Sequence, residues 1–435
     1  MFKRSSRIAA GLMVLALPLA VMPTAAQDPS YDLRFTAHPD PGIDRVQQLL
    51  VQHYQEVTHP GATVTVEKFA ASPGLDVQYA TQAAAGTLAD VIFTADLFVV
   101  PFAQNNITVD MQPLADADPS FNLDDVYPNM LDLGKVGDGL YMIPSSYDVV
   151  TMYYNKTMFE EAGAPLPEAD WTWDDYIASC KIIREKTGNY CFTTADPPSG
   201  LDSASWWAYY VPWIVGYGGK VLSDDGKTAL LSSPESLAGL QAYTDMWVKD
   251  DIGQPLDFSA GGSCFVVGKC ATWFHIPAIM GVMRGLDPQP FEWDVQVIPS
   301  LPGGKFTGMG TYGYAVSADA KNPQAAWDFI KYLVSPEMQL SIMNNYAGMP
   351  LLKSLREDPA VTNLPGPPDN ITAFIENGDN GILPTYFPGN CGSLYAGQIN
   401  QEIKDAFEAV LTKTSSVTDA FTTANDNIQS CLDAG

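Results

Sequence analysis

The order of hydrophobic patterns near the start of the chain is the feature that most constrains its fold. Residues 33–35 alternate apolar and polar side chains as a strand does, and apolar residues over 43–57 then recur at helical spacing. A second strand is predicted at 63–69, a short helix at 76–85 and a buried strand at 90–94. This order of strands and helices predicts an α/β fold with a largely parallel sheet.

Further along the chain, residues that cap helices mark where later helices begin. They are Thr172, Ser233 before Pro234, Asn322 before Pro323 and Ser335 before Pro336. Two amphipathic helices are predicted at the end, with apolar positions over 399–410 and 417–428. A length of 435 residues suits two or three packed units.

The net charge of the chain excludes some classes of binding partner. The sequence has 23 Lys and Arg against 50 Asp and Glu, which gives a net charge of −27. Such a surface repels phosphate backbones and anionic lipid, so we expect no nucleic-acid binding.

The first 26 residues resemble a signal peptide. Lys3, Arg4 and Arg7 precede an apolar run over 8–22, and small residues at 24–26 suit cleavage after Ala26. The run is shorter than the roughly 20 residues of a membrane span, although an uncleaved anchor is the alternative. No cysteine follows Ala26 to carry a lipid, so a soluble periplasmic protein is expected.

Six cysteines lie in the predicted exported part, as is typical of an oxidising compartment. Fifteen pairings are formally possible. Proximity in sequence favours three of the pairs, namely Cys180 with Cys191, Cys264 with Cys270 and Cys391 with Cys431. Structural zinc is the alternative, but no C-x-x-C occurs and the four histidines are scattered, so we expect no metal.

A glycine-rich segment at 308–313 matches G-x-G-x-x-G, the spacing of dinucleotide-binding loops. That fingerprint must open a helix, whereas this segment opens a predicted strand at Tyr314, so no nucleotide cofactor is expected. The glycines are instead expected to allow a sharp turn or a close approach of the backbone.

Other acidic clusters have structural interpretations. Asp116, Asp118, Ser120 and Asn122 alternate like calcium ligands, but Phe121 occupies the position of the required glycine. The adjacent acids at 124–125, 174–175 and 224–225 are expected to be solvated, the second pair in the first turn of a helix. Serine-hydrolase, zinc-protease and phosphate-loop motifs are absent from the sequence.

Aromatic residues gather in a segment that could form part of a binding site. Three Trp and three Tyr fall between Trp206 and Tyr217, and Trp273 and Tyr312 lie near glycines or turns. Packing explains most single rings, but several ring faces beside isolated acids suit a sugar. The C–H faces of a sugar stack on rings while its hydroxyls bond carboxylates.

The segments at 138–144 (DGLYMIP), 153–163 (YYNKTMFEEAG) and 171–176 closely resemble the signature of ABC-transporter extracellular solute-binding proteins of the maltose-binding type. Further similar segments cover nearly all of the predicted mature chain in the order of that family. They are residues 89–93, 265–269, 310–315 and 321–330.

This resemblance implies a two-lobed periplasmic binding protein fold, with crossing hinge strands and a ligand cleft between the lobes. The first lobe is expected to comprise 27–147 and 315–350, and the second 148–314 and 351–435.

The resemblance also implies ligand contacts from loops at strand ends that face the cleft. They are His38, Asp96, Ser146, Asp148, His275 and Tyr312. The aromatic pattern adds Trp206, Trp207 and Trp273 as stacking platforms. Cys270 and Thr272 depart from the small residues and Met common in the family, and no arginine stands near 384–386, which weakens the case for an anionic ligand.

The resulting hypothesis is a periplasmic receptor that captures a neutral sugar or oligosaccharide by cleft closure and delivers it to a membrane permease. It is expected to be a monomer that catalyses nothing and needs no cofactor. One alternative is a cationic ligand such as a polyamine, favoured by the acidic surface. Another is an envelope glycoside-processing enzyme, which would need an acid and a nucleophile that cannot be assigned here.

Overall fold

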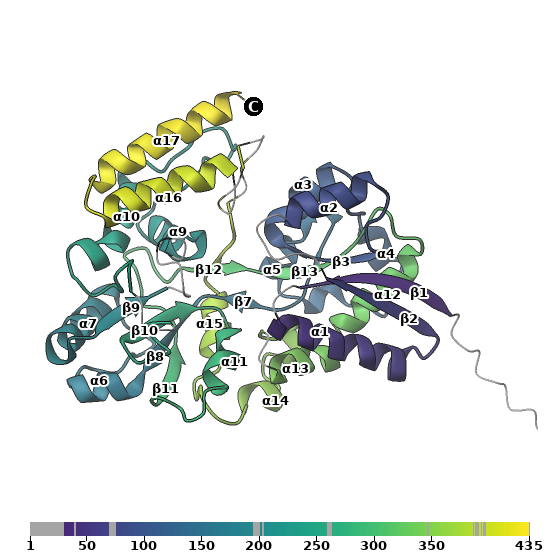
Figure 1. The fold of residues 1–435 in the computed structure, drawn as a ribbon, viewed down its shortest axis with the longest axis horizontal. Helices are drawn as coiled ribbons and strands as arrows, with labels where there is room; N and C mark the ends of the chain where they lie inside the picture. The colour runs from purple at the N-terminus through teal and green to yellow at the C-terminus, as the bar shows by residue number, and fades with distance from the viewer. Residues whose placement is uncertain are drawn as a thin grey trace, which may run out of the picture.

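The computed structural model forms two α/β lobes joined by crossing strands (Figure 1). It describes residues 30–38, 41–68, 75–194, 201, 204–258, 263–345, 348–385, 387, 391–392, 394 and 397–434. The predicted signal peptide lies outside these residues.

The first lobe is built on a five-stranded sheet with the order β2-β1-β3-β13-β6. β1 pairs in parallel with both β2 and β3, which confirms the predicted strand and helix order, whereas β13 runs antiparallel to β3. The elements of this lobe are β1 (Tyr31–Ala37), α1 (Pro41–His53), η1 (Tyr54–Thr58), β2 (Ala62–Lys68), α2 (Leu75–Ala84), β3 (Val91–Ala95), η2 (Asp96–Phe98), α3 (Val99–Gln104), α4 (Gln112–Asp116), α5 (Pro128–Asp132), β4 (Lys135–Val136), β5 (Gly139–Leu140), β6 (Ile143–Pro144), β13 (Tyr312–Val316), α12 (Pro323–Leu333) and α13 (Pro336–Asn344).

Burial explains why these residues form these elements. Leu33 and Phe35 of β1 are buried as their alternation predicts, and Trp327 of α12 is buried in the same core. Two positions assigned to the apolar face of α1 and η1 are exposed instead, Leu49 at 45% and Val57 at 63%. Leu49 and its buried neighbour Leu50 point in different directions from one helix, so only one of them can reach the core.

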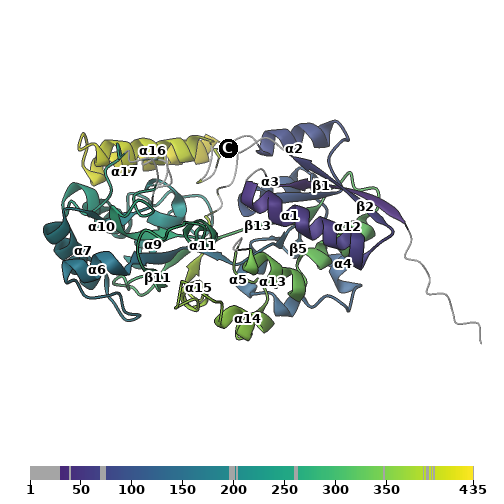
Figure 2. The same cartoon turned by 60° about the horizontal axis from the view of Figure 1, so that its bottom comes forward.

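The second lobe has a four-stranded sheet with the order β11-β8-β10-β9, in which β8 runs antiparallel to both of its neighbours. Its elements are β8 (Thr151–Asn155), α6 (Lys156–Ala162), α7 (Trp173–Thr187), β9 (Tyr190–Thr193), α9 (Trp207–Gly216), α10 (Pro234–Val248), β10 (Cys270–His275), α11 (Ile279–Arg284), β11 (Trp293–Gln296), α15 (Ala373–Gly378), α16 (Gly397–Leu411) and α17 (Val417–Ala434). The predicted final helices are α16 and α17, which form a hairpin beside α10 (Figures 1 and 2).

The predicted caps act at three of the four helices. Thr172 and Asp175 form a reciprocal capping box at α7, and Ser233 and Asn322 accept backbone N–H groups at α10 and α12. Ser335 precedes α13 but makes no capping hydrogen bond with its side chain.

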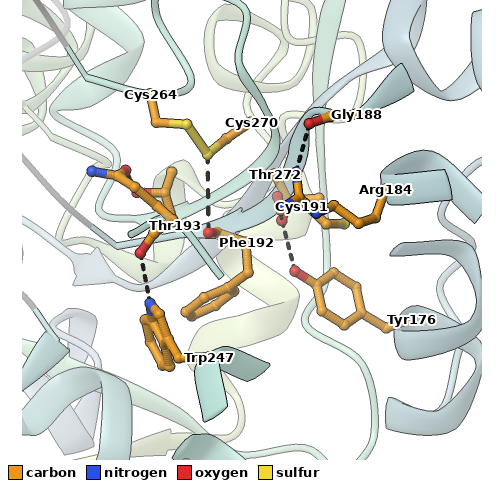
Figure 3. The surroundings of a disulfide bond; sticks show 11 residues. Tyr176, Arg184, Gly188, Cys191, Phe192, Thr193, Trp247, Cys264, Cys270 and Thr272 are labelled. Atoms are coloured by element: carbon orange, nitrogen blue, oxygen red, sulfur yellow. Dashed lines mark hydrogen bonds between the residues drawn. A yellow bond between two sulfur atoms is a disulfide. The ribbon is translucent and has the colours of Figure 1, made fainter. Parts of the chain in front are cut away.

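All three disulfides join parts of the second lobe, with the pairing that sequence proximity predicts. Cys180 of α7 bonds Cys191 of β9, Cys264 bonds Cys270 at the start of β10, and Cys391 bonds Cys431 of α17. Figure 3 shows the second of these bonds beside Phe192, whose ring belongs to the aromatic core of this lobe.

Short strands carry the chain between the lobes. A three-stranded sheet of β7 (Asp148–Val149), β12 (Thr307–Gly310) and β14 (Gly381–Ile382) lies at the crossing. β7 leads into β8 of the second lobe, and β12 leads into β13 of the first. The expected lobe boundary after 147 coincides with the start of β7, and the one after 314 falls inside β13.

The third crossing follows α13. Met349 forms a β-bridge with Tyr147, and Leu352 forms one with Val126 of the first lobe. The chain then passes through η4 (Lys353–Leu355) and α14 (Pro359–Thr362) to α15. None of the helices in the described part of the chain has the length and apolar character that a membrane span requires.

Candidate functional site

A cavity of about 320 Å³ opens at the crossing, where the end of β3 meets β7, β12 and the start of α9. This volume lies at the lower end of the range for small-molecule sites. Its polar lining side chains are Asp96, Asp148 and Thr311, and its aromatic ones are Trp206 and Tyr312. The remaining lining residues are Ala95, Leu97, Val150, Ala208, Ile276, Gly308 and Gly310.

Asp96 directly follows β3, so the carboxyl end of a buried strand carries it to the cavity. Its Oδ2 accepts the backbone N–H of Thr311 at 2.9 Å, and its own N–H donates to the carbonyl of Thr311 at 3.1 Å. Burial raises the pKa of Asp96 to about 7, although the hydrogen bonds that its carboxylate accepts from the backbone of Thr311 and Leu97 favour the charged form.

Asp148 begins β7 and meets the cavity from the other side of the crossing. Ser146 donates its hydroxyl to Asp148 Oδ2 at 2.7 Å, while Asp148 Oδ1 is buried with no hydrogen-bond partner among the described residues. Burial, and the nearby charge of Asp96, raise the pKa of Asp148 to about 7. The cavity therefore holds two acids with raised pKa values, and the charge of Asp96 disfavours the charge of Asp148.

The glycine-rich segment brings backbones together, as its sequence predicts. A Cβ at Gly308 would lie 2.5 Å from Cα of Ala208, and one at Gly310 would lie 2.8 Å from Oδ2 of Asp96. Gly310 is also the strand partner of Asp148. The segment forms β12 and β13, so the expectation that it opens a strand is confirmed.

Two aromatic rings border the cavity from different elements. Tyr312 opens β13 and stacks on Phe93 at 5.4 Å between ring centroids, with the ring of His38 against its edge at 4.7 Å. Trp206 precedes α9 and meets Tyr209 edge to face at 4.8 Å.

The structure thus brings four of the nine predicted site residues to one cavity, namely Asp96, Asp148, Trp206 and Tyr312. His38 and Ser146 lie directly behind this lining, in contact with Tyr312 and Asp148.

The other three predicted residues are buried and do not line the cavity. Trp207 is fully buried in the core of the second lobe, and a Cβ at Gly310 would lie 3.6 Å from its ring. Trp273 is 1% exposed, and its ring meets the ring of His275 at 4.9 Å between centroids. His275 precedes the lining residue Ile276 and accepts its backbone N–H at Nδ1.

Thr311 is the polar lining residue that sequence reasoning missed. It stands inside the glycine-rich segment, so the pattern marked its neighbourhood, but the side chain it contacts is 215 positions away. That distance gives no local signal.

Acidic side chains of the clusters outside the cavity form hydrogen bonds and an ion pair with neighbouring side chains. Asp118 accepts bonds from Lys331 and Trp327, and the Lys331 ammonium lowers the pKa of Asp118. Asp225 accepts from Ser223, and Asp125 from Ser354. Across the described ranges, no group of three His, Cys, Asp or Glu side chains could hold a metal ion.

The cavity therefore offers acceptor oxygens and two aromatic rings in one lining. A ligand with several hydroxyl groups could donate to Asp96 and Asp148, while its C–H surface packs on Trp206 and Tyr312.

The comparisons with known proteins agree with one another. The model of the family described as bacterial extracellular solute-binding protein matches residues 41–340. A Brucella abortus (strain 2308) protein, named as a binding protein, is 26% identical over 362 residues, 81% of this chain and 82% of its own length. An arabinooligosaccharide-binding protein of Halalkalibacterium halodurans is 27% identical over 207 residues, 44% of this chain and 43% of its own.

Among solved structures, an ABC substrate-binding protein from Listeria monocytogenes in complex with cycloalternan has the same two-lobed fold. Its TM-score is 0.79 at 21% identity, and the match covers 93% of this chain and 100% of that one.

Proposed function

Because the chain belongs to the family of bacterial extracellular solute-binding proteins, we propose that the cavity at the crossing strands captures a neutral sugar or oligosaccharide for an ABC importer. The chain would deliver this sugar to the membrane permease. The observation that carries the proposal is that two acids and two aromatic rings, from both sides of the crossing, line one cavity.

The mechanism follows from where these groups lie. Asp96 and Tyr312 adjoin strands of the first sheet, whereas Trp206 adjoins a helix of the second lobe. Rotation of the lobes about β7 and β12 would bring the two sets of contacts onto one ligand. Closure would also remove water, which strengthens each hydroxyl-to-carboxylate hydrogen bond.

The named ligands of similar proteins support a carbohydrate. The proteins that match this chain include one named for arabino-oligosaccharides and one solved with cycloalternan. We further propose that the chain acts in the periplasm as a monomer without a lipid anchor, after removal of residues 1–26, and that it catalyses no reaction.

A panel of neutral sugars and polyamines tests the ligand class. We expect several sugars to raise the melting temperature of the purified chain, and calorimetric titration then to give the affinity for the best of them. Stabilisation by polyamines alone would contradict the proposed sugar ligand. Release of reducing sugar from an oligosaccharide, lost on changing one carboxylate, would instead indicate an enzyme.

Asp148→Ala tests the site directly. The loss of a hydrogen bond to a charged acceptor should weaken sugar binding by roughly 1.5 to 3 kcal/mol. The matched control is Asp225→Ala, because Asp225 accepts from a neighbouring serine as Asp148 does but lies outside the cavity. An unchanged isotherm for Asp148→Ala would remove Asp148 from the site.

A further inference from the structure

Thr311 contacts one of the two acids directly. It connects β12 to β13, at the point where the chain crosses from the second lobe to the first, and it is 6% exposed. Its N–H donates to Asp96 Oδ2 at 2.9 Å, and its carbonyl accepts the N–H of Asp96 at 3.1 Å. Asp96 is therefore held at both its backbone and its carboxylate by one residue.

The hydroxyl of Thr311 extends toward the second acid. Its Oγ1 lies 3.0 Å from the carbonyl oxygen of Ser146 and 2.7 Å from that of Tyr312. Ser146 in turn donates its own hydroxyl to Asp148 Oδ2 at 2.7 Å. One hydroxyl proton shared between two carbonyls thus ties Thr311, which holds Asp96, to the backbone of Ser146, whose side chain donates to Asp148.

The surroundings of this network are closely packed. A Cβ at Gly310 would lie 2.8 Å from Asp96 Oδ2, and one at Gly348 would lie 2.7 Å from Cβ of Ser146. Ser145 extends the network, since its N–H and hydroxyl both donate to the carbonyl of Tyr312 at 2.9 Å. The backbone around the two acids has little room to shift without breaking these bonds.

The cavity lining offers no positive side chain to hold the two acids in place. The cavity lining contains no Lys or Arg, and the residues of 30–435 outside the described ranges contain none in the sequence. Two acids without a fixed cation repel each other and favour rotation toward water. Fixed donors on Oδ2 of both acids oppose that rotation, and Asp148 Oδ1 is left without a partner in the described part of the chain.

We propose that Thr311 is a positioning residue for ligand binding, whose amide and hydroxyl orient Asp96 and Asp148 together across the crossing strands. The inference rests on the proposed function, because it concerns how the same cavity presents its acceptors to a sugar. Since Thr311 lies where the lobes connect, closure of the cleft and orientation of the acids depend on the same short segment.

The test compares Thr311→Val with Thr311→Ser, using the neutral sugar that most stabilises the wild-type chain. Valine keeps the shape and the backbone N–H but removes the hydroxyl, whereas serine keeps the hydroxyl. We expect about 3- to 10-fold weaker binding for the valine variant, the range for one neutral hydrogen bond, and affinity within about 2-fold of wild type for serine.

A pH profile of affinity separates positioning from a general loss of structure. The bond from Ser146 favours the charged form of Asp148, so loosening Ser146 raises the pKa of Asp148 further. The pH below which sugar affinity falls should therefore move upward in Thr311→Val and stay in place in Thr311→Ser. The other titratable groups nearby, His38, Tyr153 and His275, are unchanged in both variants.

Thr272→Val is the matched control. Thr272 is also buried and its hydroxyl donates to the carbonyl of Cys191 at 2.9 Å, beside the disulfide of Figure 3, and it does not line the cavity. It should lower stability without changing the affinity or its pH profile. Ser146→Ala provides a second variant if Thr311→Val does not fold, and it should shift the pH profile in the same direction.

The outcomes are distinguishable. A wild-type chain that binds no sugar would overturn the proposed function, and this inference with it. The other case is a wild-type chain that binds sugar while Thr311→Val binds it as tightly as wild type, or while Thr311→Ser binds it as weakly as Thr311→Val. Either result would overturn the proposed role of Thr311 and leave the proposed function standing.

Discussion

The crossing strands and the core of the second lobe contain opposite kinds of buried side chains. At the crossing, Asp96 is buried and Asp148 is half-buried with its Oδ1 out of contact with water, and the cavity lining holds no cation beside them. In the second lobe, aromatic rings such as Trp213 and Tyr243 meet edge to face, 5.1 Å apart between centroids, and all three disulfides tie the surrounding elements together.

These two regions differ in what they do to the free energy of unfolding. Buried carboxylates destabilise the folded chain when they are ionised, whereas packed rings and disulfides stabilise it. The comparison indicates that the site needs a rigid support, since two uncompensated acids alone would favour opening of the crossing to water. Variants that change one region at a time test this difference.

Asp96→Asn should have the largest effect, and it should stabilise the chain. The pKa of Asp96 rises from 3.8 to about 7 on folding, so between these pH values the native chain binds more protons than the unfolded chain. The free energy of unfolding of the wild type should therefore fall as pH rises from about 4 to 7. At about 1.4 kcal/mol per pKa unit, the asparagine variant should be more stable at about pH 8 by on the order of 4 kcal/mol.

Chemical denaturation at about pH 4 and about pH 8 measures this difference. Asp225→Asn is the control, because the bond from Ser223 lowers the pKa of Asp225. Replacing that carboxylate should therefore give no increase in the free energy of unfolding. If Asp96→Asn were no more stable than wild type at about pH 8, the crossing would not carry the destabilising charge that the comparison assigns to it.

Disulfide removal tests the supporting region. Cys391 and Cys431 are 40 positions apart, so replacing both with alanine should cost about 4 kcal/mol by loop-closure entropy. Cys264 and Cys270 are only 6 apart, and the same change there should cost about 2 kcal/mol. Denaturation of both variants under non-reducing conditions checks the order, and a larger loss for the shorter loop would contradict an entropic contribution.

The features that could be predicted from the sequence are those that patterns within short segments determine. The strands and helices of the first lobe, the caps at Thr172 and Ser233 and the three disulfides follow from patterns within short segments. The family resemblance implied Asp96 as a site residue because it directly follows a buried strand, where ligands gather in α/β sheets.

What sequence could not predict depends on tertiary packing. Trp206 and Trp207 are neighbours with the same composition around them, yet one lines the cavity and the other is 0% exposed in the core. The direction in which α9 enters the lobe decides between them, and that direction is set by contacts with α10 and β12 rather than by the helix itself. The direct stacking of Trp207 on a ligand stays a prediction.

The smallest expected effect separates these two tryptophans and so locates the border between the regions compared above. Trp206→Ala should weaken sugar binding about 5-fold, corresponding to about 1 kcal/mol of aromatic contact, and should change stability little because the ring is only partly buried. Trp207→Phe should do the reverse, since a smaller ring leaves unfilled space against Gly310 in a closely packed core. Calorimetric titration and denaturation of both variants give the four numbers needed. If Trp207→Phe lost affinity while keeping its stability, the ring of Trp207 would belong to the binding surface, and the border between site and core would lie one residue further into α9.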